Sequence, residues 1–214
     1  TGASRGIGLE FVRQYSALGW KVIATCRDPA GAAELNTLAH GQPGISIEKM
    51  DVSDAASVAA SAARHHGEPI DLLINNAALL GPRGKQQFGQ LDFRLFEDSF
   101  ATNAIGPMRV TEAFIDNVAA GKGRRILTLT SAAGSIGMLN PPANLYQYRA
   151  SKAALNLLMK NLANELKPRG ILVALVNPGL VDTRGLLALK PGDPVPDEFA
   201  PLMPLIRNGT VKLI

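Results

Sequence analysis

Apolar residues are arranged along this chain in two ways, one typical of β-strands and one typical of α-helices. Five segments rich in apolar residues have the length of β-strands: residues 21–26, 45–50, 70–75, 126–130 and 171–176. Apolar residues recur at helical spacing between them, in segments 9–18, 32–39, 54–63, 92–119 and 145–166. Strands that are apolar throughout are typical of a parallel sheet covered on both faces. The pattern therefore predicts an α/β fold, a doubly wound parallel sheet of Rossmann type in three layers, α/β/α.

Local signals place several element boundaries. Gly19 is expected to end the first helix, and Asp54 or Ser53 to cap the third one. The segment 92–119 is one long helix or two, because Gly106-Pro107 is expected to kink it.

The chain opens with the glycine-rich stretch Thr1-Gly2-Ala3-Ser4-Arg5-Gly6-Ile7-Gly8 and then enters the first helical segment. Glycines let backbone N–H groups approach an anion closely, and a helix N-terminus adds partial positive charge. Two interpretations fit this stretch, a dinucleotide pyrophosphate site and an ordinary helix-entry turn. The glycines alone do not decide between them.

Polar residues follow the ends of the predicted strands. Ligands bind at the carboxyl ends of the strands in parallel α/β sheets. We therefore expect one crevice to be lined by the side chains Arg27, Asp51, Asn75, Asn76, Ser131 and Asn177.

Tyr148 and Lys152 stand four residues apart on the last predicted helix, so they share a face one turn apart. An exposed helix face gives the same spacing, but this pair follows a strand that ends in Ser131. A free phenol has a pKa near ~10, and a neighbouring ammonium would lower that pKa toward neutral pH. The phenol could then protonate a carbonyl oxygen held by Ser131, while a nicotinamide carries the hydride.

Composition narrows the function classes. The net charge of +4 comes from scattered basic residues, which argues against a nucleic-acid interface. A single cysteine permits no internal disulfide, and the three histidines lack partners at metal-ligand spacing. No apolar run reaches the ~18 residues of a membrane span. We expect one cytoplasmic domain, 1–214, without metal or membrane, in which 182–208 forms a substrate loop or lid.

Taken together, the motifs resemble those of the short-chain dehydrogenase/reductase family, over residues 1 to about 183. They occur in the family's order and nearly at its spacings: Thr1-Gly2-x-x-x-Gly6-x-Gly8, Asp51, Asn75-Asn76-Ala77, Asn103, Ser131-x-x-Gly134, Tyr148-x-x-x-Lys152 and Asn177-Pro178-Gly179. The context Tyr-Arg-Ala-Ser-Lys and the short substrate loop are most similar to the C-factor and sniffer-type carbonyl reductases. The resemblance implies reduction of an aldehyde or ketone, or the reverse alcohol oxidation. It also implies a homodimer or homotetramer paired through the two long helices.

The resemblance implies catalytic roles for four residues. Tyr148 would be the acid/base, and Lys152 its partner and the ribose anchor. Ser131 would hold the carbonyl. Asn103 would steady a water that links Lys152 to solvent.

The resemblance implies cofactor contacts as well. Asp51 and Val52 would meet the adenine ring, and Thr183 the nicotinamide amide. The full implied set is Gly2, Ser4, Arg5, Gly6, Ile7, Gly8, Arg27, Asp51, Val52, Asn76, Ala77, Tyr148, Lys152, Pro178, Gly179, Val181 and Thr183.

Cofactor choice depends on the end of the second strand that the family would have. An acidic residue there would select NAD by bonding the ribose 2′-OH. This chain has Cys26 followed by Arg27, with Arg5 in the glycine stretch, and two guanidiniums suit a 2′-phosphate. NADP(H) is therefore the expected cofactor, and NAD is less favoured.

Three features depart from the family pattern. Ala78 stands where glycine is usual, and the gap from Ser131 to Tyr148 is several residues longer than usual. The first and last strands of the family's sheet are missing, so we expect the chain to be clipped at both ends. Two hypotheses follow: an NADP(H)-dependent carbonyl reductase, or a non-catalytic NADP-sensing regulatory protein on the same fold. A sensor would be expected to have a broken Ser, Tyr and Lys set, and here the set is intact.

Overall fold

The computed structural model describes residues 1–139, 144–179 and 181, so the expected lid at 182–208 and Thr183 lie outside the described residues. All strand pairs in this part of the chain are parallel. β1 (Val22–Cys26) pairs with β2 (Ile45–Lys49) in one sheet. The second sheet has the order β3 (Leu72–Asn75), β4 (Arg125–Leu129), β5 (Leu172–Val176).

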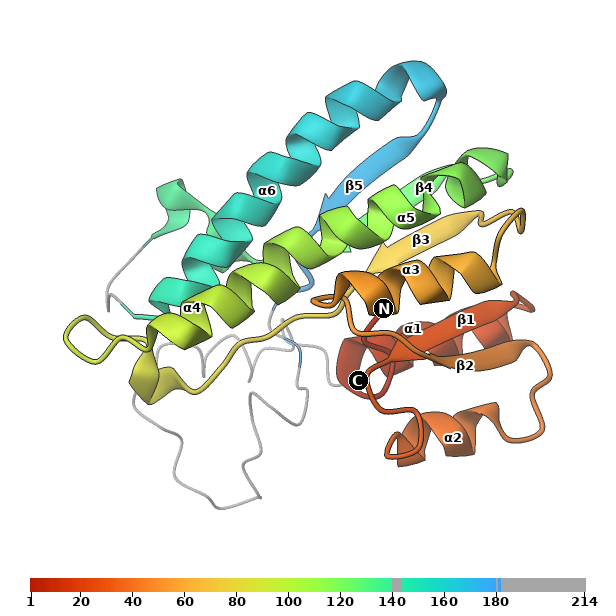
Figure 1. The fold of residues 1–214 in the computed structure, drawn as a ribbon, viewed down its shortest axis with the longest axis horizontal. Helices are drawn as coiled ribbons and strands as arrows, with labels where there is room; N and C mark the ends of the chain where they lie inside the picture. The colour runs from red at the N-terminus through yellow and green to blue at the C-terminus, as the bar shows by residue number, and fades with distance from the viewer. Residues whose placement is uncertain (140–143, 180, 182–214) are drawn as a thin grey trace, which may run out of the picture.

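In the described part of the chain, helices lie on both sides of the β1–β2 sheet and along one face of the β3–β4–β5 sheet (Figure 1). The helices α3 (Ala55–Arg64), α5 (Gly106–Ala120) and α6 (Tyr146–Leu166) run along one face, against β2, β3, β4 and β5. α1 (Gly6–Ala17) lies behind β1, and α2 (Ala33–Ala39) packs on α1 and β2. The predicted α/β fold of Rossmann type is confirmed. Within the described ranges, no helix combines the length and the apolar character needed to cross a membrane.

Residues 1–3 lie between the two sheets and bond to both. The backbone N–H of Ala3 donates to the Thr25 carbonyl of β1 at 3.0 Å, and the Thr1 nitrogen donates to the Ile74 carbonyl of β3 at 2.8 Å. The Thr1 hydroxyl accepts the backbone N–H groups of Asn76 and Ala77, both at 3.1 Å. The glycine stretch is thereby fixed beside the carboxyl ends of β1 and β3.

A wide helical turn joins α4 (Phe93–Phe100) to α5. Residues Ala101–Ile105 form a π-helical turn immediately before Gly106 and Pro107. Proline has no backbone N–H, so the helical hydrogen-bond ladder must be rearranged near this position. The sequence predicts a kink at this point, and the structure provides a π-turn that buries Asn103 completely. Such turns occur frequently at functional sites.

Other boundaries follow local chemistry. The Asp54 side chain accepts the backbone N–H groups of Ala56 and Ser57, which confirms it as the cap of α3. β3 begins at Leu72 rather than at residue 70, because the backbone N–H of Ile70 donates to the Asn117 carbonyl of α5. α1 begins at Gly6 rather than at residue 9, within the glycine stretch.

Two apolar clusters form the core. The larger one packs α3, α5 and α6 on the sheets and includes Val58, Val110, Val118 and Ile126, none more than 1% exposed. The smaller one lies between α1, α2 and the β1–β2 sheet, around Leu35. Each fully buried side chain of this size contributes about 1.5–3 kcal/mol to the free energy of unfolding. These clusters hold α1 at Val12 and α6 at its C-terminal end, at Leu166.

Candidate active site

Tyr148 and Lys152 lie one turn apart on α6, close to the end of β4. Lys152 is 2% exposed, and its ammonium donates to the Leu129 carbonyl at 2.8 Å. The Lys152 Nζ atom lies 6.0 Å from the centre of the Tyr148 ring. The predicted pair is thus one unit, with the ammonium on the sheet side of the phenol.

The ionisation of this pair differs from the sequence-based expectation. Burial lowers the pKa of Lys152 to about 8. Burial also raises the pKa of Tyr148, and a hydrogen bond with the Ser131 side chain opposes that rise only in part. The prediction that Lys152 lowers the phenol's pKa is wrong for this structure, because removal from water disfavours both charged forms. Near neutral pH the phenol therefore keeps its proton.

Ser131 lies two residues after the end of β4 and caps the short helical turn Ala132–Gly134. Its hydroxyl accepts the backbone N–H of Ala133 at 3.2 Å and remains beside the Tyr148 phenol. Gly134 packs directly on α6, where an added Cβ would lie 2.7 Å from the Lys152 carbonyl carbon. The contact of Gly134 with α6 therefore places the Ser131 hydroxyl beside the pair of Tyr148 and Lys152.

Asn103 connects the π-turn to the loop after β3 and to α6. Its side-chain oxygen accepts the Leu79 N–H at 2.6 Å, and its amide donates to the Leu79 carbonyl at 2.8 Å and to the Ser151 hydroxyl at 3.0 Å. Ser151 in turn donates to the Tyr148 carbonyl at 2.8 Å. The side chain of Asn103 thus fixes the backbone around Tyr148. Its expected role toward a water stays a prediction.

The glycine stretch is shaped by contact with Asn76. The Asn76 amide donates to the carbonyls of Thr1 and Gly2 at 2.9 and 3.1 Å. A Cβ on Gly8 would lie 2.2 Å from the Gly2 carbonyl oxygen, and Gly2 itself has a φ of +66°. No side chain of the described residues caps the N-terminus of α1. Its first N–H groups are therefore free to bind an anion, which fits the pyrophosphate interpretation.

Two arginine side chains lie near Asp51, in the loop that follows β2. Burial alone would raise the pKa of Asp51, but hydrogen bonds from Ser53 and the charges of Arg27 and Arg109 lower it. Arg109 also donates to the Val52 carbonyl at 2.7 Å, and an added Cβ on the neighbouring Gly106 would lie 3.0 Å from Val52. The sequence alone does not indicate a role for Arg109, because its hydrogen-bond partner Val52 is 57 residues away.

The remaining strand-end residues have different roles. Asn75 is 3% exposed and donates to the Thr111 hydroxyl of α5 at 3.1 Å, so its predicted place in the crevice is wrong. Neighbouring residues of a strand point to opposite faces, and only Asn76 reaches the glycine stretch. Asn177 is exposed and accepts the Gly179 N–H at 3.2 Å. Arg5 and Arg27 are exposed as well, with their guanidiniums unburied at this edge of the molecule.

Comparison with known proteins identifies the family for most of the chain. A sequence model described as short chain dehydrogenase matches residues 1–192. The C-signal protein of Myxococcus xanthus is 38% identical over 115 residues, which is 54% of this chain and 68% of that protein.

Solved structures give the same result. NADPH-bound carbonyl reductase from chicken fatty liver superposes with a TM-score of 0.79 at 33% identity, over 92% of this chain and 82% of that one. The carbonyl reductase Sniffer of D. melanogaster gives a TM-score of 0.76 at 27% identity, over 85% of this chain and 79% of that one. The predicted similarity to C-factor and sniffer-type proteins is confirmed.

Proposed function

The chain belongs to the short-chain dehydrogenase family of oxidoreductases, and on this premise we propose that it is an NADP(H)-dependent carbonyl reductase. The observation that carries the proposal is the unit of Ser131, Tyr148 and buried Lys152 at the end of β4. A hydroxyl, a protonated phenol and an ammonium in one place suit proton transfer to a carbonyl oxygen.

Each group of this unit has a defined task in reduction. Ser131 donates a hydrogen bond to the substrate's carbonyl oxygen, and the Tyr148 Oη atom gives that oxygen its proton. The raised pKa of Tyr148 keeps the phenol in the protonated form that reduction requires. Lys152 holds ribose hydroxyls and stabilises the phenolate that proton transfer leaves behind. NADPH, when bound, supplies the hydride for the carbonyl carbon.

The cofactor would be held along the carboxyl edge of the strands. The open N-terminus of α1, with Gly2, Gly6 and Gly8, suits the pyrophosphate. The loop of Asp51 and Val52 would receive the adenine. The remaining expected contacts belong to the same proposal: Ser4, Ile7, Asn76, Ala77, Pro178, Gly179, Val181 and Thr183.

The proposed preference for NADP(H) rests on charge. Arg27 follows β1 directly, and Arg5 precedes α1, so both exposed guanidiniums belong to the end of the site where a 2′-phosphate would lie. A guanidinium binds phosphate oxygens in a bidentate manner. The similar chicken carbonyl reductase is an NADPH-bound structure, which supports the same choice.

Turnover of carbonyl compounds tests the proposal. NADPH oxidation is followed by absorbance with a panel of aldehydes, ketones and quinones, for the wild type and for Tyr148→Phe. We expect turnover that falls by a factor of ~10³ or more without the phenolic proton. Tyr146→Phe is the matched control and should keep its activity, because Tyr146 is an exposed tyrosine at the start of α6, two residues before Tyr148. Tight NADPH binding without turnover on any carbonyl would instead support the sensor hypothesis.

We also propose that the chain pairs through its two long helices. Phe93 on α4, Ile105 in the π-turn and Leu157 on α6 are apolar and exposed, which supports a helix-mediated contact between copies. Light scattering tests this, because a monomeric mass at micromolar concentration would contradict it.

A further inference from the structure

The helix that carries Tyr148 begins without a cap of its own. Leu145, immediately before α6, has left-handed backbone geometry with a φ of +56°, and its side chain makes no capping bond. The first N–H groups of any helix have no partner within the helix and need one from elsewhere. At α6 these N–H groups include that of Tyr148 itself.

Gln86 supplies this cap from a distant part of the chain. Its backbone carbonyl accepts the N–H of Tyr146 at 3.4 Å, and its side-chain oxygen accepts the N–H of Tyr148 at 3.3 Å. Gln86 is completely buried, and its amide donates to the Leu80 carbonyl at 2.6 Å. One glutamine thus bonds the loop after β3 and the first turn of α6 at the same time.

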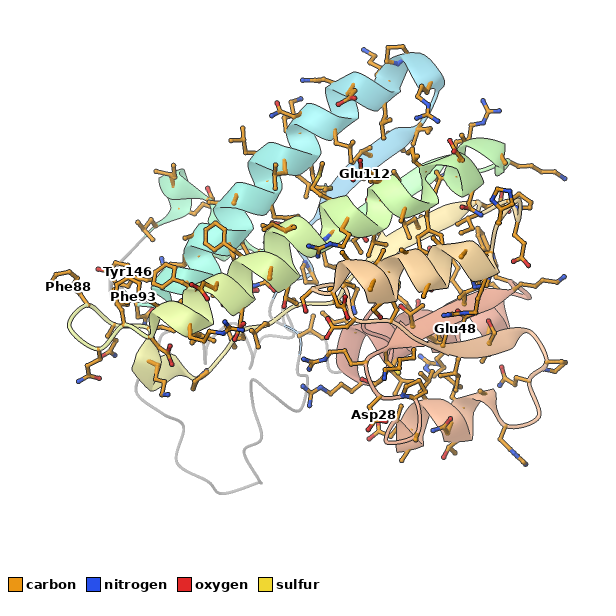
Figure 2. The ribbon with its side chains drawn as sticks, in the orientation of Figure 1. Asp28, Glu48, Phe88, Phe93, Glu112 and Tyr146 are labelled. Carbon is orange, nitrogen blue, oxygen red and sulfur yellow. The ribbon has the colours of Figure 1, made fainter. Side chains whose placement is uncertain are left out.

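A second buried glutamine strengthens the same contact. Gln147, also completely buried, donates to the Lys85 carbonyl at 2.7 Å. Figure 2 shows Phe88, Phe93 and Tyr146 gathered where this loop meets the start of α6. The loop and the helix start are therefore joined by bonds on three successive residues of α6.

The backbone of Tyr148 is consequently held on both sides. Its N–H is bound by Gln86, and its carbonyl accepts the Ser151 hydroxyl, which Asn103 holds. Both chains of contacts lead back to Leu79 and Leu80 after β3. The Tyr148 backbone cannot move along or around the helix axis without breaking one of them.

We propose that Gln86 is a positioning residue, which fixes the Tyr148 phenol beside Ser131 by capping α6 from the loop after β3. This inference rests on the proposed reductase function. It assigns catalytic importance to a residue that touches neither substrate nor cofactor. Displacement of a reacting group by about 1 Å lowers rates by up to ~10²-fold, so a small shift of the first turn is measurable.

The test replaces the bonding groups and keeps the size. Gln86→Met removes the side-chain bonds to Tyr148, Leu80 and Pro82, whereas Gln87→Met changes an exposed neighbour and is the matched control. Gln86→Glu keeps an oxygen for the Tyr148 N–H, and its protonated carboxyl can also donate to the Leu80 carbonyl, so it tests rescue at low pH. We measure kcat for a carbonyl reduced by the wild type, the Kd for NADPH, the melting temperature and the 13Cζ resonance of labelled Tyr148.

We expect Gln86→Met to lower kcat about tenfold, to keep the Kd for NADPH within twofold, and to shift the Tyr148 resonance. Gln86→Glu should regain activity only as the pH falls and its carboxyl becomes protonated, because a carboxylate would face the Leu80 carbonyl, and Gln87→Met should lose nothing. An unchanged kcat and resonance in a folded Gln86→Met protein would overturn the proposal, even if its melting temperature fell. If that variant does not fold, Gln86→Asn, which withdraws the oxygen by one methylene, replaces it.

The outcomes separate this inference from the proposed function. A wild type that turns over no carbonyl defeats the reductase function, and the Tyr148 resonance then decides the positioning role alone. A wild type that is active, with all three glutamine variants equally active, defeats only the inference.

Discussion

Gly134→Ala probes the contact that brings Ser131 and Lys152 together. The added methyl group would lie 2.7 Å from the Lys152 carbonyl carbon and 2.9 Å from the Ala153 nitrogen, whereas ordinary contact begins at 3.4 Å. The turn after β4 and α6 must therefore separate by roughly 0.7 Å at residue 152, since 2.7 Å must become 3.4 Å. Both contacting atoms belong to the helix backbone, so no side-chain rotation can relieve the overlap.

This separation acts directly on the proposed chemistry. Ser131 lies at the start of the displaced turn and Tyr148 one helical turn from Lys152, so the distance from hydroxyl to phenol changes by a similar amount. A displacement near 1 Å lowers rates by up to ~10²-fold, and we expect kcat to fall by roughly ten- to a hundredfold. Overpacking of this kind also lowers the free energy of unfolding by about 1–3 kcal/mol.

The assay compares Gly134→Ala with Gly137→Ala. A Cβ on Gly137 meets no atom of the described structure within 4 Å, so this control adds the same methyl group without overlap. We measure kcat by NADPH oxidation with the best carbonyl substrate, and the free energy of unfolding by urea titration. Equal kcat and equal stability in the two variants would refute the reasoning, because the close approach of residue 134 would then have no consequence.

Two further predictions concern charge. Arg27→Ser should raise the KM for NADPH roughly tenfold or more and leave the KM for NADH within twofold, since a bond to a charged group contributes about 1.5–3 kcal/mol. Steady-state kinetics with both cofactors check this. Arg13→Ser, which changes another exposed arginine, is the control. Burial alone would lower the pKa of His65, but bonds to Glu68 and Glu48 raise it above its ordinary value of 6.5. The charged form therefore stabilises the fold fully below pH 6.5, and this contribution is lost as pH rises through the raised pKa. The buried Thr1 ammonium and Lys152 have lowered pKa values and titrate nearby, so the difference in melting temperature between the wild type and His65→Gln is measured. This difference should shrink as pH rises from below 6.5 through the raised pKa of His65, and identical pH profiles would contradict the prediction.

The sequence predicted those parts of the site that depend on local spacing. Apolar runs at strand length gave the parallel sheet, and the side chain of Asp54 caps α3 as expected. The four-residue spacing of Tyr148 and Lys152 placed both on one face of a helix. These features need only the helical period and the preference of short polar side chains for caps.

Features that depend on distant partners could not be predicted in this way. Gln86 and Tyr148 are 62 residues apart, and Arg109 and Val52 are 57 residues apart. No periodicity relates such positions, because their contact exists only after the helices pack on the sheet. Asn75 and Asn76 show a related limit: both follow the same strand, but their side chains leave it on opposite faces.

Burial also affects the protonation states of Tyr148 and Lys152. Sequence spacing predicted an ammonium that lowers the phenol's pKa, but the packing of α6 on β4 removes both groups from water. With a pKa of about 8, the Lys152 amine is mostly protonated at neutral pH, and the Tyr148 phenol is protonated as well. A site in that state already holds the proton that a carbonyl oxygen takes up on reduction, whereas alcohol oxidation must first remove it. The proposed reduction therefore needs no change in the protonation of Tyr148 at neutral pH, and burial extends the protonated state of the phenol to higher pH.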